Sequence, residues 1–243
     1  MSVRAELVTK IYGNQRALNG VSFTVNSGEI VGILGPNGAG KTTIMKIITG
    51  FLHPEEGKVW INDALVEGNA LEIRRQIGYL PENNPLYSDL YVTEYLEYVA
   101  GIYHLKAVKT RVKEMIGLTG LEPEKHKKIG ALSKGYRQRV GIAQALIHDP
   151  SVLILDEPTS GLDPSQIVEI RQLIRNISAR KTVMLSTHIM QEVESLCSVV
   201  IMIHQGNLVE QGRIKDICDK NGVDTIERAF LKIVSQNLKG GLN

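Results

Sequence analysis

The chain carries Gly35-Pro36-Asn37-Gly38-Ala39-Gly40-Lys41-Thr42 between the apolar segment Ile30–Leu34 and the helix-like segment Thr43–Thr49. These eight residues fit the pattern G-x-x-x-x-G-K-[ST], which forms a phosphate-binding loop when a strand precedes it and a helix follows it. Glycines let the backbone curl so that several N–H groups point inward, at a helix N-terminus whose partial positive charge favours anions. We therefore predict that the residues from Gly35 to Thr43 bind the phosphates of a nucleotide.

An acidic segment downstream completes the predicted nucleotide site. Val152–Leu155 is an apolar run that ends in Asp156 and Glu157. A buried strand followed by carboxylates suits a metal and water site, so we expect Asp156 to hold Mg²⁺ through its coordinated water and Glu157 to orient or deprotonate the attacking water. Lys41 would neutralise the β- and γ-phosphates, and Thr42 would offer its hydroxyl to Mg²⁺. Taken alone, Asp-Glu after a strand is as typical of a solvated turn, and the upstream loop favours the nucleotide site.

Segments rich in β-branched residues alternate with helix-length segments, which predicts an α/β sheet. The strand-like segments are Val21–Val25, Ile30–Leu34, Lys58–Ile61, Ile77–Leu80, Val152–Leu155 and Val183–Leu185. Further along, Val199–Ile203 and Asn207–Val209 flank His204-Gln205-Gly206, which predicts a hairpin turn. A last helix is expected near Thr225–Gln236, with one apolar stripe formed by Ile226, Ala229, Phe230 and Ile233.

The strand signals stop between about Leu86 and Ala131. Apolar residues instead recur at one-turn intervals in this part of the chain: Val92, Tyr95, Leu96 and Val99. That spacing is typical of an amphipathic helix. We predict a helical subdomain that is inserted into the sheet domain.

The composition excludes several classes of protein. With 243 residues and 43% hydrophobic content, the chain can bury a sizeable core. The formal net charge of +2 gives no reason to expect nucleic acid as the main partner. Cys197 and Cys218 lie 21 positions apart without Cys-x-x-Cys spacing, so no structural metal or disulfide is expected. The apolar runs are of strand length, and the chain is not expected to cross a bilayer.

The segment Leu132-Ser133-Lys134-Gly135-Tyr136-Arg137-Gln138-Arg139 resembles the signature L-S-x-G-x-x-Q of the ATP-binding-cassette (ABC) family. The resemblance implies that Ser133, Lys134, Gly135 and Gln138 contact the γ-phosphate of an ATP molecule bound by the opposite subunit. The simpler interpretation, in which Ser133 is the N-cap of a helix from Tyr136 to His148, is compatible with that role because a capped N-terminus presents N–H groups to anions.

Further matches to the ABC family follow in its usual order, between about Val3 and Gly212. The resemblance implies that Tyr12 stacks on adenine and that Asp163, in Ser160-Gly161-Leu162-Asp163, lies at the subunit contact. It also implies that His188, after Ser186-Thr187, donates a hydrogen bond to the γ-phosphate and steadies the catalytic geometry. A lone tyrosine or histidine would otherwise be assigned to packing or to the surface.

One position departs from the common pattern of the family. After Ile77–Leu80 the family usually has a glutamine that reaches Mg²⁺, whereas here Pro81 is followed by Glu82. A carboxylate can still bind Mg²⁺, although a turn in which Glu82 faces water is the alternative. Cassettes of simple bacterial exporters, including gliding-motility transporters, can carry Pro-Glu-Asn here, and the segment Ile226–Lys232 is similar to theirs. The resemblance therefore implies an exporter.

The family resemblance implies a P-loop NTPase (RecA-like) core sheet with an antiparallel β subdomain and an inserted helical subdomain that carries the signature. We expect residues 1–243 to form a single ABC ATPase domain. Its core would comprise 1–85 and 150–215, its helical subdomain about 86–149, and its C-terminal helical tail about 216–243.

The resemblance also implies the partners, which are a second cassette, with a homodimer favoured, and integral membrane transporter subunits. The chain would then lie peripherally at the cytoplasmic face of the membrane. The segment Tyr87–Tyr103 holds five tyrosines, which either pack the helical subdomain or contact the membrane subunit. They are Tyr87, Tyr91, Tyr95, Tyr98 and Tyr103.

Two other functions compete with this interpretation. A non-transport ABC ATPase, acting on the ribosome or in DNA repair, usually has two cassettes, a long coiled coil or zinc modules, none of which this sequence shows. A P-loop kinase or switch GTPase would not explain the signature, and the guanine-reading Asn-Lys-x-Asp is absent. The sequence therefore favours an ATP hydrolase coupled to transmembrane transport, with ATP and Mg²⁺ as cofactors.

Overall fold

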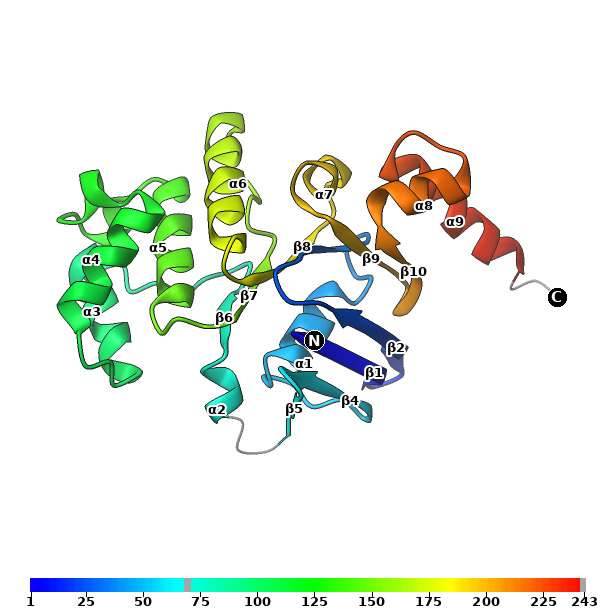
Figure 1. Cartoon of the computed structure of the whole chain (residues 1–243), viewed down its shortest axis with the longest axis horizontal. Coiled ribbons are helices and arrows are strands. Elements are labelled where there is room, and N and C mark those ends of the chain that lie inside the picture. Colours follow the sequence, from blue (N-terminus) through cyan, green and yellow to red (C-terminus); the bar gives the residue numbers. More distant parts are fainter. Residues whose placement is uncertain (68–70, 241–243) are drawn as a thin grey trace.

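The computed structural model describes residues 1–67 and 71–240, with the backbone alone for 237–240. Its centre is a six-stranded sheet in the order β10-β9-β3-β8-β7-β6 (Figure 1). These strands are β3 (Ile30–Leu34), β6 (Ile77–Leu80), β7 (Val152–Asp156), β8 (Thr182–Thr187), β9 (Val199–His204) and β10 (Asn207–Arg213). The strands from β9 to β6 are parallel, and β10 is antiparallel to β9. Parallel strands covered on both faces are nearly continuous apolar runs, as β3 is here and as β7 is up to Asp156.

A second, antiparallel sheet has the order β2-β1-β4-β5. Its strands are β1 (Val3–Tyr12), β2 (Gln15–Val25), β4 (Glu56–Ile61) and β5 (Ala64–Leu65). Helix α1 (Lys41–Ile48) lies between the two sheets, and its buried side chains join both in one hydrophobic cluster (Figure 1). The predicted strands and the predicted α/β class are confirmed, while β1 and β5 are additions that the sequence patterns did not indicate.

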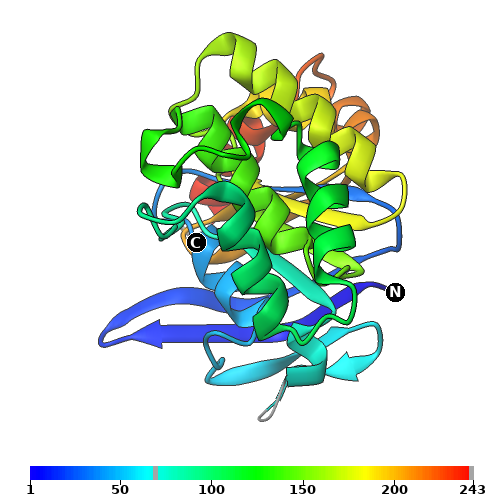
Figure 2. The same cartoon turned by 90° about the vertical axis from the view of Figure 1, so that its left-hand side faces the viewer.

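Helices gather beside β6 in the part of the chain where strand signals stop (Figure 2). They are α3 (Val92–Ile102), α4 (Val108–Thr119) and α5 (Lys134–Leu146), with short 3₁₀ turns at Glu122–Glu124 and Ile129–Ala131. The predicted one-turn stripe is buried on α3, where Val92, Tyr95, Leu96 and Val99 face the core. Helix α2 (Leu71–Arg74) precedes β6. The helical segment is confirmed, whereas the proposed domain boundaries stay a prediction.

The remaining helices follow the strands of the main sheet. They are α6 (Pro164–Ser178), α7 (Met190–Leu196), α8 (Ile214–Asn221) and α9 (Ile226–Gly240). Helix α6 packs with α5 on the face of the sheet opposite α1. The expected stripe of α9 is buried against α7, α8 and β10. Strands β9 and β10 form the predicted hairpin, with Gln205 and Gly206 in its turn. Within the described residues, no helix is both long and apolar enough to span a membrane.

Candidate nucleotide site

The phosphate-binding loop leaves β3 at Leu34 and enters α1 at Lys41. A Cβ on Gly35 would lie 2.2 Å from the carbonyl oxygen of Ile203, and one on Gly40 would lie 2.6 Å from that of Ala17. Gly40 also has a φ of 110°, which side chains rarely adopt. The loop is thus pressed against two neighbouring backbones, and glycine is required at both positions. No side chain caps α1, so its first N–H groups remain available to an anion.

A cavity of about 600 Å³ opens at the N-terminus of α1. It unites predicted residues from five separate parts of the chain, namely Tyr12, the loop, Glu82, Glu157 and His188. The loop residues at its wall are Asn37, Gly38, Gly40, Lys41, Thr42 and Thr43. Gly35, Pro36 and Ala39 do not line the cavity, and their carbonyl oxygens instead accept hydrogen bonds, the first two from Lys41 and the third from the N–H of Gly206. Gln15, Ala17 and Ser160 also line it, and no role in nucleotide binding was predicted for them.

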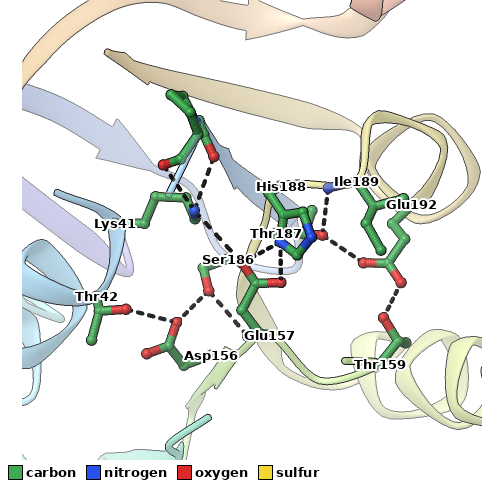
Figure 3. A network of polar contacts seen from close by, with 12 residues as sticks. Lys41, Thr42, Asp156, Glu157, Thr159, Ser186, Thr187, His188, Ile189 and Glu192 are labelled. Carbon is green, nitrogen blue, oxygen red and sulfur yellow. Dashed lines mark hydrogen bonds and ion pairs between the residues drawn. The ribbon is translucent and has the colours of Figure 1, made fainter. Parts of the chain in front are cut away.

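Lys41 is held by its own loop and faces a carboxylate. Its Nζ donates to the carbonyl oxygens of Gly35 at 2.9 Å and of Pro36 at 3.3 Å. The same Nζ lies 3.6 Å from Oε1 of Glu157, and the two side chains are only 6% and 9% exposed (Figure 3). An ammonium group with three donors can be oriented by two carbonyls and still address an anionic ligand. The geometry suits a cation that binds phosphate.

The group around Asp156 fits a hard cation such as Mg²⁺. Oδ1 of Asp156 accepts a hydrogen bond from the hydroxyl of Ser186 and another from Thr42 at 3.3 Å (Figure 3). Oδ2 is buried and, among the described residues, has no hydrogen-bond partner. A buried carboxylate oxygen without a partner is costly unless a ligand or ion satisfies it. Oxygen donors of this kind are the ligands that Mg²⁺ prefers.

Both the backbone and the carboxylate of Glu157 are held by contacts with the segment from Ser186 to His188. Glu157 has a φ of 50°, a left-handed conformation that is strained for a non-glycine residue. Its N–H is held by Ser186, at 3.2 Å from the carbonyl oxygen and 3.1 Å from Oγ. Its two carboxylate oxygens lie 3.1 and 3.0 Å from Nδ1 of His188 (Figure 3). The side chains of Glu157 and His188 therefore form one unit at the mouth of the cavity.

The signature residues lie away from this loop. Ser133 caps α5 and accepts from the N–H of Tyr136 at 3.3 Å, as predicted, although the helix begins at Lys134 and ends at Leu146. Lys134 and Gln138 line a second cavity of about 680 Å³, to which Lys41 does not contribute. Glu82 is exposed and lines both cavities.

Close packing fixes the start of α5. A Cβ on Gly135 would lie 2.8 Å from Cδ of Gln166, so α6 approaches the helix closely here. Nε2 of Gln138 donates to the carbonyl oxygen of Pro158 at 2.8 Å, which ties the signature helix to the segment after Glu157. The exposed Ser133 thus projects from a firmly held helix terminus.

Sequence reasoning missed the polar residues that support the site. Ser186 holds both Asp156 and the N–H of Glu157, and Glu192 receives the hydroxyls of Thr159 and Thr187 (Figure 3). A serine within a strand and a glutamate on a short helix have no distinctive spacing. The only signal was that Ser186 and Thr187 precede His188, and it did not reveal which groups they contact.

Fold and site together define a nucleoside-triphosphate hydrolase with a phosphate-binding loop, and comparison with known proteins gives its family. The family model described as "ABC transporter" matches residues 18–160. The chain is 36% identical to the ABC transporter ATP-binding protein NatA of Bacillus subtilis, over 89% of each chain. It is 38% identical to the Nod factor export ATP-binding protein I of Burkholderia lata, over 90% of this chain and 74% of that protein.

Solved structures agree with this assignment. The structure of the ATP-binding subunit of an ABC transporter superposes with a TM-score of 0.86 and 30% identity, over 96% of this chain and 100% of the other. A dimeric ATP-binding cassette in a post-hydrolysis state, bound to ADP and Pi, gives 0.79 and 29%, over 87% of this chain and 98% of the other. The chain belongs to the ABC transporter family and is an ATP-binding subunit with ATPase activity. The transport interpretation is thereby favoured over the non-transport ATPase.

Proposed function

We propose that this chain is the motor subunit of an exporter and that two copies close head to tail around two ATP molecules. One observation carries the proposal. Lys41 lines one cavity, which we call the loop cavity, whereas Lys134 and Gln138 line a different one, which we call the signature cavity. One ATP molecule bound at the loop of one copy would meet Ser133 of the other. Neither site would be complete in a single chain, and binding energy would drive closure.

The predicted side chains in the cavity lined by Lys41, together with the neighbouring Asp156, have separate tasks in this proposal. Lys41 binds the β- and γ-phosphates, and Tyr12 stacks on adenine. Thr42 and Asp156 would hold Mg²⁺, which, when bound, neutralises charge on the phosphate oxygens. Glu157 accepts the proton of the attacking water, and His188 steadies Glu157 and the γ-phosphate. The support is the short contact between His188 and Glu157 and the partnerless oxygen of Asp156.

Export is the direction of transport that the relatives favour. One relative is named for Nod factor export. Another, the bacitracin transport ATP-binding protein BcrA of Bacillus licheniformis, is 40% identical over 84% of this chain and 67% of that protein. We place this chain peripherally at the cytoplasmic face of the membrane, beside integral subunits that form the path for the substrate.

A groove between the segment that follows α1, strand β6 and the helices α3 and α5 is the proposed contact with those membrane subunits. It has a volume of about 210 Å³ and lies between Phe51 and Tyr103. Phe51 is 73% exposed, which is unusual for a large apolar side chain beside a groove. The ring of Tyr103 stacks on His148, with centroids 4.0 Å apart, and burial lowers the pKa of His148, so this ring stays neutral.

The five tyrosines divide between packing and exposure. Tyr95 is buried, and its hydroxyl donates to Gln144 at 2.8 Å. Tyr87 contacts the rings of Tyr95 and Tyr98 and is exposed, as Tyr91 is. Tyr103 lines the groove. We therefore assign contact with the membrane subunit to Tyr103 and leave Tyr95 as a packing residue.

Phe51→Ser is expected to release the chain from its membrane subunits, because it removes the largest exposed apolar surface beside the groove. The measurement is the share of the chain that stays with washed membranes of its own host. Leu231→Ser is the matched control, since Leu231 is 61% exposed but lies on α9. Equal retention of Phe51→Ser and the wild type would contradict the assignment of the groove.

Glu82→Gln is expected to raise the Mg²⁺ concentration that supports half-maximal ATPase activity, while ATP binding changes little. The carboxylate attracts Mg²⁺ more strongly than an amide does, and it also repels the γ-phosphate. The support is that Glu82 lines the same cavity as Thr42. Titrations of Mg²⁺ with wild type and variant test this, and superimposable curves would assign Glu82 to a solvated turn instead.

A further inference from the structure

Glu192 is a buried carboxylate that does not line the nucleotide cavity. It lies in the first turn of α7 and is only 1% exposed. Its two oxygens face two different segments, since the hydroxyl of Thr159 donates to Oε1 and that of Thr187 donates to Oε2 at 2.7 Å (Figure 3). The N-terminus of a helix and two hydroxyl donors offset the cost of burying this carboxylate. An apolar side chain would fill the space without that cost, so the polar contacts call for an explanation.

One carboxylate oxygen of Glu192, Oε1, holds the segment that follows Glu157 by accepting from Thr159. Thr159 lies two residues after Glu157, and Ser160 donates its N–H to the carbonyl oxygen of Glu157 at 3.1 Å. The segment then ends at Asp163, whose carboxylate caps α6 by accepting from the N–H of Gln166 at 2.9 Å. Because the backbone of Glu157 itself is strained, a fixed contact at Thr159 helps to maintain its conformation.

The other carboxylate oxygen of Glu192, Oε2, holds the segment that carries His188 by accepting from Thr187. Oγ1 of Thr187 donates to Glu192 and accepts from the N–H of Ile189 at 3.0 Å. The backbone on both sides of His188 is therefore fixed through one hydroxyl. His188 itself is partly exposed, with 44% of its side chain accessible, so packing alone does not determine its position.

We propose that Glu192 is a positioning residue that clamps the segments of Glu157 and His188 at a fixed separation. Through the two threonines, it keeps Nδ1 of His188 at 3.0 and 3.1 Å from the Glu157 carboxylate. The inference rests on the proposed roles of Glu157 and His188 in hydrolysis. We expect substitutions of Glu192 to lower turnover and to leave ATP binding unchanged, because Glu192 does not line the nucleotide cavity.

Glu192→Gln is expected to lose one of the two threonine hydrogen bonds, and Glu192→Ala is expected to lose both. A glutamine has one acceptor oxygen, which can receive the Thr187 proton, while its amide leaves the Thr159 proton without that acceptor. Alanine removes both contacts. Side chains that orient the ligands of a metal contribute about 10- to 100-fold to affinity or activity, and on the same scale we expect kcat to fall about tenfold in Glu192→Gln and about a hundredfold in Glu192→Ala. KM for ATP should stay within about twofold of the wild type.

Amide hydrogen exchange gives a second measurement, one that does not depend on activity. In Glu192→Ala, peptides that cover 157–163 and 186–189 should both exchange faster than in the wild type. Glu194→Gln is the matched control, because Glu194 lies on the same helix but accepts from the N–H of Ile226 at 2.7 Å. This control should retain the wild-type kcat and the wild-type exchange of both segments. A similar loss of kcat in Glu194→Gln would overturn the proposal.

Thr159 provides a milder pair of variants if Glu192→Ala does not fold. Thr159→Val keeps the shape and removes the hydroxyl, whereas Thr159→Ser keeps the hydroxyl. We expect kcat to fall in the first and to be retained in the second, and equal kcat values in the two would overturn the proposal. So would an unchanged kcat in Glu192→Ala, or a raised KM with kcat retained.

The Glu157→Gln variant separates a failure of the proposed role of Glu157 from a failure of the clamp formed by Glu192. If Glu157→Gln hydrolyses ATP at the wild-type rate, the proposed role of Glu157 fails. If Glu157→Gln is inactive while the Glu192 variants are fully active, only the clamp fails.

Discussion

Glu157→Gln should lower ATP hydrolysis by at least about a hundredfold, because an amide cannot accept the proton that a general base removes from water. Glutamine has nearly the shape of glutamate, so the fold and the cavity should be preserved. ATP should still bind, since Lys41 keeps its contacts with the carbonyl oxygens of Gly35 and Pro36. The expected product is a long-lived dimer that ATP holds together.

Two measurements check this result, namely the steady-state ATPase rate and the elution volume on size exclusion with and without ATP. Glu210→Gln is the control, because Glu210 pairs with Lys220 on the surface, as Glu157 pairs with Lys41 in the cavity. The control should hydrolyse ATP at the wild-type rate. Hydrolysis at the wild-type rate by Glu157→Gln would show that Glu157 is not the general base. Rapid dissociation of the dimer in the presence of ATP would contradict the proposed closure of two copies around ATP.

Local patterns were sufficient to predict the parts of the site that a strand, a loop or a helix start defines. The loop from Gly35 to Thr42 follows a continuous apolar strand, and Ser133 has the position of a cap. These features depend on neighbours in the sequence. Patterns of this kind also predicted all six strands of the main sheet, five of which are parallel and form nearly continuous apolar runs.

Strand β1 shows why other elements were not predicted. Its register against β2 shifts at three places, and Leu7 is exposed with a φ of 49°. Such irregularities disturb the alternation of apolar and polar residues from which strands are recognised. The pattern of Val3–Tyr12 is therefore mixed, although tertiary pairing with β2 and β4 makes it a strand of ten residues.

The contacts of Ser186 and Glu192 depend on residues that are distant in the sequence. Ser186 reaches Asp156 and Glu157 across neighbouring parallel strands, 30 and 29 positions away. Glu192 reaches Thr159 across 33 positions. No periodicity links residues at these separations, and only the sheet order places β7 beside β8. Local sequence patterns and the family resemblance point to the groups expected to meet ATP, whereas the groups that position them become visible only in the folded chain.

Mixing two inactive variants should restore ATP hydrolysis, which is the most direct consequence of a site shared between two chains. Lys41→Ala removes the cation of the loop, and Ser133→Asp places a negative charge where the γ-phosphate of the partner's ATP would lie. Aspartate is a good N-cap, so helix α5 should still begin at Lys134. Ser133→Asn, which caps equally well and has an amide donor but no charge, is the matched control and should lose much less activity than Ser133→Asp.

A mixed dimer has one intact site, formed by Lys41 of the Ser133→Asp chain and Ser133 of the Lys41→Ala chain, and one site with both defects. In an equal mixture half of the dimers are mixed, so independent sites in a two-fold symmetric dimer would give roughly a quarter of the wild-type activity. Mixing Lys41→Ala with the double variant Lys41→Ala/Ser133→Asp forms no intact site and should restore nothing. If differently tagged chains form mixed dimers and activity still does not return, Lys41 and Ser133 do not serve the same ATP molecule. Recovery would instead mean that the two cavities, separate in each chain, become one site only between chains.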